Sequence, residues 1–83
     1  MEANEELEEV ICMIKELSED FSVPRNVKKN LVVIEGILKD ESKDISLRVD
    51  KAVSILDEVS EDPNIQMFTR TQIWNLVSML SKL

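Results

Sequence analysis

Two stretches of the sequence, ICMIKELSED at residues 11–20 and VSILDEVSED at residues 53–62, match at an offset of 42 residues. Glu16, Ser18, Glu19 and Asp20 recur identically in the second stretch. Further matched positions are Val23 with Ile65, Lys28 with Arg70, Leu31 with Ile73, Ile34 with Leu76, and Leu38 with Leu80. A repeat of this length predicts one supersecondary unit that is used twice. The alternative explanation is a chance match between helical hairpins, which share one pattern of apolar stripes and acidic ends.

Apolar residues recur every three or four positions along four segments, which predicts helices over about residues 5–19, 24–39, 45–60 and 66–82. The first two helices are expected to turn inward Leu7, Val10, Ile11, Ile14, Leu17 and Phe21, then Val27, Leu31, Ile34 and Leu38, widened by Val32, Val33 and Ile37. The last two are expected to turn inward Ile45, Val49, Ala52, Val53, Leu56 and Val59, then Ile73, Leu76, Val77, Leu80 and Leu83.

Residues near the helix boundaries support these segments. Asn4 and Asp44 are expected N-caps, and Pro24 suits the first position of the second helix. Gly36, the only glycine, lies inside that helix, where it costs about 1 kcal/mol relative to alanine. We expect the close approach of a neighbouring helix to compensate, with a ligand contact as the alternative.

Four helices of similar length joined by short connections predict an all-α fold, a four-helix up-and-down bundle. It is expected to consist of two αα-hairpins, over about residues 4–39 and 44–82, related by an approximate internal two-fold repeat. With 83 residues the chain is expected to form a single domain.

The side chains that many enzymes use are missing. The chain has no histidine, one cysteine and one glycine, which excludes Ser–His–Asp and Cys–His catalysis, histidine zinc sites and glycine-rich phosphate loops. We therefore expect no catalytic residue, no cofactor, no metal site and no enzyme activity. Cys12 is expected to be a small buried apolar side chain rather than a reactive thiol.

The net charge and the hydropathy of the chain limit the molecules it is expected to bind and the place where it is expected to act. The net charge is −7, with 17 acidic and 10 basic residues, which argues against a general nucleic-acid surface without excluding a local one. The longest uninterrupted apolar run, Leu31–Ile34, is far too short to cross a membrane. The acidic N-terminus lacks the basic segment of a signal peptide, so we expect a cytoplasmic protein.

Charged residues also follow the repeat. Asp20 and Lys28 occupy the same repeat positions as Asp62 and Arg70, with the acid closing one helix and the base one turn into the next. We predict that each acid forms an ion pair with its base across the turn, and that Arg25 adds to the first pair. Such a pair contributes about 0–1 kcal/mol where it is exposed.

Arg25, Lys28 and Lys29 form a basic group at the start of the second helix. This group is expected to be a solvated face. Contact with a phosphate or RNA is the alternative, because helix N-termini attract anions. No aromatic residue is expected beside it to stack on a base.

The fourth helix carries large apolar side chains outside its core stripe, namely Met67, Phe68, Trp74 and Met79. Packing on the bundle edge is one interpretation. The other is a protein interface, because Trp and Met are enriched in protein–protein contacts. A small core makes a homodimer a plausible way to bury this surface.

Two turn motifs carry a family resemblance. The first is SVPRN at residues 22–26, and the second is DPN at residues 62–64 followed by RTQIWN at residues 70–75. With these motifs the chain resembles uncharacterised protein family 0147, which consists of small archaeal helical-bundle proteins. The similarity covers nearly the whole chain. One departure is Gln66, where the family has a proline that matches Pro24. The resemblance implies the fold and an archaeal cytoplasmic origin, and it transfers no catalytic residue.

The sequence leaves the biological role open between two main functions. The favoured one is a small non-catalytic interaction or assembly module that associates with itself. The alternative is an accessory protein of RNA or ribosomal machinery that binds RNA or a basic protein. An enzyme is disfavoured, because four short helices leave little room for a concave site.

Overall fold

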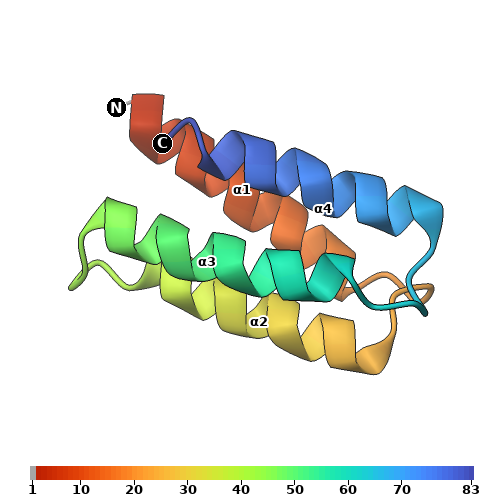
Figure 1. Ribbon diagram of the computed structural model, residues 1–83. Coiled ribbons are helices and arrows are strands. Elements are labelled where there is room, and N and C mark those ends of the chain that lie inside the picture. The colour runs from red at the N-terminus through yellow and green to blue at the C-terminus, as the bar shows by residue number, and fades with distance from the viewer. Residues whose placement is uncertain (1) are drawn as a thin grey trace.

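The computed structural model describes residues 2–83, with side chains described from Glu5 onward. It contains the helices α1 (Glu2–Ser18), α2 (Arg25–Lys39), α3 (Ile45–Ser60) and α4 (Met67–Leu80), with no strand in the described residues (Figure 1). The helices alternate in direction and form an elongated molecule of 35 × 19 × 19 Å. The predicted all-α, up-and-down four-helix bundle is confirmed.

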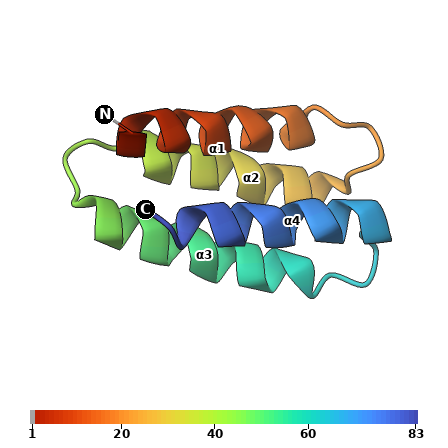
Figure 2. The ribbon, with the colours of Figure 1, turned by 90° about the horizontal axis from the view of Figure 1, so that it is seen from above.

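The helices are arranged in a ring of neighbours. α1 packs against α2, α2 against α3, α3 against α4, and α4 against α1, whereas the Cα atoms of the diagonal pairs stay more than 8 Å apart among the described residues (Figure 2). The α1–α2 and α3–α4 connections lie together at one end, here called the closed end. The α2–α3 connection lies at the opposite end with both chain termini, here called the open end.

The predicted core stripes are largely correct. Thirteen of the fifteen buried apolar side chains come from the four helices, and they all stand at positions expected to face inward. These are Val10, Ile14, Leu17, Val27, Leu31, Ile34, Leu38, Ala52, Leu56, Val59, Ile73, Leu76 and Leu80. The other two, Val23 and Ile65, come from the two connections at the closed end and cover that end of the core.

Phe21 was expected to continue the inward face of the first helix, and this prediction is wrong. Its side chain is 99% exposed. α1 ends at Ser18, so the helical period no longer applies at residue 21. Val23 turns inward instead.

Three other side chains predicted to be buried are exposed. Val32 and Val33 lie on the outside of α2, since they follow buried Leu31 and each helical step rotates a side chain by about 100°. Cys12 lies on the outer face of α1 and is a free, exposed thiol rather than a buried apolar group.

Gly36 is also on an outer surface. A Cβ atom at this position would have nothing within 4 Å, and the residue is exposed. The predicted close approach of a neighbouring helix is therefore wrong, and nothing in the described bundle requires glycine at this position.

The helix starts differ in detail from the predicted ones. α1 begins at Glu2, so Asn4 lies inside the helix and is not its N-cap. Pro24 is the N-cap of α2 rather than its first residue, and Asp44 is the N-cap of α3 as predicted. Gln66 is the N-cap of α4, the place that Pro24 holds before α2, with the same extended backbone conformation.

All three connections have the same construction. Each contains an aspartate near its start, Asp20, Asp40 or Asp62, whose carboxylate accepts a hydrogen bond from the main-chain N–H two residues later. The carbonyl of the same aspartate accepts the N–H three residues later, at distances of 3.2, 3.3 and 3.4 Å. The carbonyl of the residue four positions after each aspartate then accepts the first hydrogen bond of the next helix. The donors are the N–H groups of Lys28, Arg48 and Arg70.

This shared construction changes the interpretation of the sequence repeat. The three aspartates are separated by 20 and then 22 residues, and the offset of 42 relates the first to the third. The aspartate turn therefore recurs at all three connections, while the offset of 42 residues relates the two turns that end in a buried apolar residue, Val23 and Ile65.

Candidate functional site

A basic residue follows each connecting aspartate by eight positions, and two of these bases bind the end of the preceding helix. Arg70 donates from Nε to the Ser60 carbonyl at 3.0 Å and from Nη2 to the Asp62 carbonyl at 3.2 Å. Arg48 donates from Nη1 to the Leu38 carbonyl at 2.9 Å. Both satisfy carbonyls that a helix C-terminus otherwise leaves without partners.

Asp62 and Arg70, one of the two predicted ion pairs, make other contacts. Asp62 accepts hydrogen bonds from the Asn64 N–H at 2.8 Å and the Asn26 side-chain amide at 2.7 Å, while Arg70 binds main-chain carbonyls. Arg70 therefore does reach across its turn, although not to the carboxylate. Among the described side chains the one ion pair is between Lys39 and Glu35 within α2, at 2.8 Å.

The first turn differs from the other two at its basic residue. Asp20 accepts hydrogen bonds from the N–H and the hydroxyl of Ser22, both at 2.8 Å. Lys28, the counterpart of Arg70, places its Nζ 5.6 Å from the centre of the Phe21 ring. This distance is within the range of a cation–π contact.

The turn hydrogen bonds stabilise the charged form of each aspartate, so each pKa lies below its ordinary value. For Asp20 the main-chain N–H of Ser22 lowers the pKa most, followed by its hydroxyl. For Asp40 the Ser42 hydroxyl lowers the pKa most, followed by its N–H. For Asp62 the Asn64 N–H lowers the pKa most, followed by the Asn26 amide.

The basic group of Arg25, Lys28 and Lys29 lies at the closed end, at the start of α2. Arg25 and Lys29 are exposed, and Lys28 is half-buried beside Phe21. The expectation that no aromatic residue lies beside these bases is wrong, because the ring of Phe21 is almost fully accessible next to Lys28.

The large apolar residues of α4 divide between two faces. Met67, Phe68 and Trp74 are 75%, 63% and 51% exposed, and lie outside the core stripe. Met79 is partly buried and packs against the core. The candidate interface is therefore an outer face of α4 (Met67, Phe68 and Trp74) that does not include Met79.

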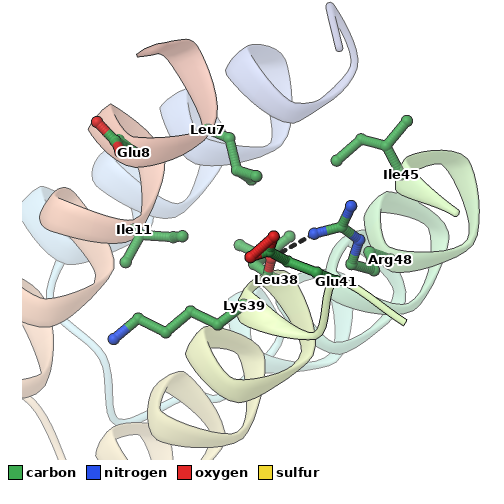
Figure 3. A pocket seen from close by; sticks show the side chains of 8 residues that line it. All are labelled: Leu7, Glu8, Ile11, Leu38, Lys39, Glu41, Ile45 and Arg48. Atoms are coloured by element: carbon green, nitrogen blue, oxygen red, sulfur yellow. Dashed lines mark hydrogen bonds between the residues drawn. The ribbon is translucent and has the colours of Figure 1, made fainter. Parts of the chain in front are cut away.

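A pocket of about 740 Å³ lies at the open end of the bundle, between α1 and the connection from α2 to α3 (Figure 3). Four apolar and four charged side chains line it: Leu7, Ile11, Leu38, Ile45, Glu8, Lys39, Glu41 and Arg48. The guanidinium of Arg48 lies between the apolar side chains, with one end bonded to the Leu38 carbonyl (Figure 3).

The turn sequences explain why the pocket forms at this end. At the closed end, the residue three positions after the aspartate is apolar and buried in both turns, as Val23 and Ile65. The equivalent residue at the open end is Lys43, which is exposed. The α2–α3 connection therefore supplies no apolar side chain to cover the core.

Arg48 was not singled out from the sequence, and its surroundings are unusual. Its Nε is fully covered yet has no hydrogen-bond partner among the described residues. The signal that could have indicated it is the spacing of eight residues between each turn aspartate and the following base, shared by Lys28, Arg48 and Arg70.

No helix within residues 2–83 has both the length and the apolar character needed to span a membrane.

Comparisons with known proteins agree with the resemblance seen in the turn motifs. A model of an uncharacterised protein family, UPF0147, matches residues 1–83. A UPF0147 protein of Methanosarcina mazei is 38% identical over 79 residues, which cover 95% of this chain and 85% of the relative. One from Thermococcus kodakarensis is 38% identical over 80 residues, covering 95% and 96%.

A crystal structure of the protein MMP1188, whose function is unknown, has the same fold. It matches with a TM-score of 0.90 and 37% sequence identity, over 94% of this chain and 89% of that one. The sequence match over the full length and the shared bundle lead to one conclusion: the chain belongs to the uncharacterised protein family UPF0147.

Proposed function

We propose that this protein is a small, non-catalytic interaction module that self-associates through the outer face of α4. The observation that carries the proposal is Trp74, which stays half-exposed on a helix whose opposite face already fills the core. Met67 and Phe68 extend the same exposed surface toward the closed end. Buried aromatic side chains supply much of the binding energy in protein interfaces.

The available surface is adequate for a second copy of the chain. A stable dimer buries at least about 600 Å² on each partner, which is about a ninth of the 5431 Å² surface of this molecule. α4 has 14 residues and is therefore about 21 Å long. Two such helices packed side by side are long enough to form the centre of an interface of that size.

The proposed setting is the cytoplasm. An exposed, unpaired cysteine such as Cys12 is typical of a reducing compartment, where thiols are kept from forming disulfides.

Sedimentation velocity at protein concentrations from about 1 to 100 μM, bracketing the micromolar affinity of a weak dimer, tests self-association. We expect a concentration-dependent dimer for the wild type and a monomer for Trp74→Ala. Leu47→Ala removes an exposed apolar side chain from α3 and is the matched control, expected to dimerise normally. A wild type that stays monomeric, or a Trp74→Ala variant that dimerises as well as the control, contradicts the proposal.

RNA binding is the second candidate, favoured by one observation at the closed end. The exposed Phe21 ring lies beside Lys28, with Arg25 and Lys29 near the same helix start. Aromatic rings beside basic groups are the usual platform for single-stranded nucleic acid. Fluorescence anisotropy with a labelled single-stranded RNA would show binding that Phe21→Ala weakens, with Phe68→Ala as the matched aromatic control. No binding at low salt removes this candidate.

A further inference from the structure

We propose that the open-end pocket binds a small molecule that carries a carboxylate on an apolar chain, with Arg48 as the carboxylate-binding residue. This site is separate from the outer face of α4, which contributes no residue to the pocket. The pocket is partly open to solvent, and its volume of about 740 Å³ is large enough to hold such a molecule.

The apolar part of the ligand is specified by the lining. Leu38 is completely buried at the base of the pocket, while Leu7, Ile11 and Ile45 are only partly covered. These three side chains come from α1 and α3, which lie diagonally across the bundle, and they point toward the space between those helices (Figure 3). An alkyl chain placed there would bury apolar surface that the bundle itself leaves accessible.

The charge of the ligand is specified by Arg48. The other charged residues of the lining, Glu8, Lys39 and Glu41, are exposed, and the Lys39 ammonium is already bonded to Glu35. Water screens exposed charges strongly, so they select weakly between ligands. Arg48 is partly buried, and a guanidinium in this position favours a carboxylate, which it can bind through two hydrogen bonds.

Comparison of the two capping arginines indicates that Arg48 can still accept a ligand. Arg70 gives Nε and Nη2 to main-chain carbonyls. Arg48 gives only Nη1, and its covered Nε has no acceptor among the described residues. Arg48 Nη2 makes no hydrogen bond among the described residues, so it can donate to a carboxylate in the pocket while Nη1 stays bonded to the Leu38 carbonyl.

A matched pair of ligands tests the proposal on the wild-type protein. Octanoate and octanamide have the same chain length and differ in charge. In a titration followed by two-dimensional NMR, we expect octanoate to shift the amide signals of Leu7, Ile11, Leu38 and Ile45. We expect octanamide to bind at least about tenfold more weakly than octanoate, because it cannot make the charge-assisted contact with Arg48.

Arginine variants supply the second test. Arg48→Gln is expected to weaken octanoate binding by about tenfold or more, and Arg48→Lys, which keeps the charge, to restore part of it. Arg70→Gln removes the same kind of helix cap at the closed end and is the matched control, expected to bind octanoate as the wild type does.

Three results would overturn the proposal. These are octanoate shifts confined to α4, equal binding of octanoate and octanamide, and an Arg48→Gln variant that binds as tightly as Arg70→Gln. The ligand comparison needs no variant, so it decides the matter even if Arg48→Gln does not fold. None of these results depends on dimerisation through α4.

Discussion

Gly36 stands in the middle of α2 with open space where a side chain would be. Its φ angle is not positive, so an L-residue fits the backbone without strain. We expect Gly36→Ala to raise the free energy of unfolding by about 0.5–1 kcal/mol, because alanine has the higher helix propensity and restricts the unfolded chain. Urea denaturation measures the change, and Gly36→Ser should give a smaller gain. A loss of stability would contradict the open space around this position.

The three turn aspartates make stability depend on pH in the acid range. Their folded pKa values lie below the ordinary value of 3.8, because turn N–H and side-chain groups bond to the carboxylates. A carboxyl group with a lowered folded pKa stabilises the protein above its unfolded pKa, and this contribution disappears as the pH falls through the folded pKa.

We therefore expect the urea midpoint to be steady near neutral pH and to fall below about pH 4, where aspartate begins to take up protons. An Asp20→Asn, Asp40→Asn, Asp62→Asn variant can keep the turn hydrogen bonds but does not titrate, so its midpoint should fall less steeply with acid. The other carboxylates are the same in both proteins. Equal acid slopes for the two would contradict the role given to these aspartates.

At the scale of the elements, Arg70 connects α4 to the end of α3 through main-chain carbonyls. Arg70→Gln should lower the free energy of unfolding by about 1.5–3 kcal/mol, as expected for hydrogen bonds from a charged donor in a partly buried position. Because the Asp62 carboxylate is not its partner, a double-mutant cycle with Asp62→Asn, which removes the charge but keeps an acceptor for the turn N–H, should give a coupling energy near zero. A coupling above about 1 kcal/mol would indicate the carboxylate–guanidinium pair instead.

Lys28 stands where the other two turns have a capping arginine, ten residues after Ser18 as Arg70 is after Ser60. We expect Lys28→Arg to bind the carbonyls at the end of α1 and to raise the free energy of unfolding by about 0.5–1.5 kcal/mol. Lys29→Arg, at an exposed position, is the control and should change little. If the two variants are equally stable, the α1–α2 turn does not provide the geometry of the other two.

The helices could be predicted from the sequence because burial on a helix follows a fixed period. The stripe of Val27, Leu31, Ile34 and Leu38 is fully buried for this reason. The errors have two causes: the helix had already ended, or an apolar residue type was given more weight than the period. Phe21 follows the last helical residue, and Val32 is apolar in type but points away from the core.

The candidate sites were less predictable than the helices. Trp74 and Phe68 could be identified as residues beside the core stripe, which is a local property of one helix. The pocket depends on how α1, α2 and α3 meet at the open end, and its key residue, Arg48, has an ordinary place in the sequence. The alternative partner of Arg70 was missed for a related reason, since sequence spacing cannot distinguish a carboxylate from the carbonyl of the same residue.

At the scale of the whole molecule, the net charge of −7 opposes the approach of two copies. We expect dimerisation to strengthen when salt rises from roughly 20 to 200 mM, because shorter Debye lengths screen this repulsion. RNA binding through Arg25, Lys28 and Lys29 would weaken over the same range. Sedimentation and anisotropy at the two salt concentrations therefore separate the two functions, and a dimer that dissociates at high salt would contradict association through the apolar face of α4.

The ring of helix neighbours makes the starting point of the chain arbitrary. α1 and α4 pack together like every other adjacent pair, and their free ends lie beside the α2–α3 connection. The order α3, α4, α1, α2 would therefore trace the same bundle. A circularly permuted chain, with a short linker from residue 83 to residue 2 and a break within residues 40–44, would keep both closed-end turns and every helix pair.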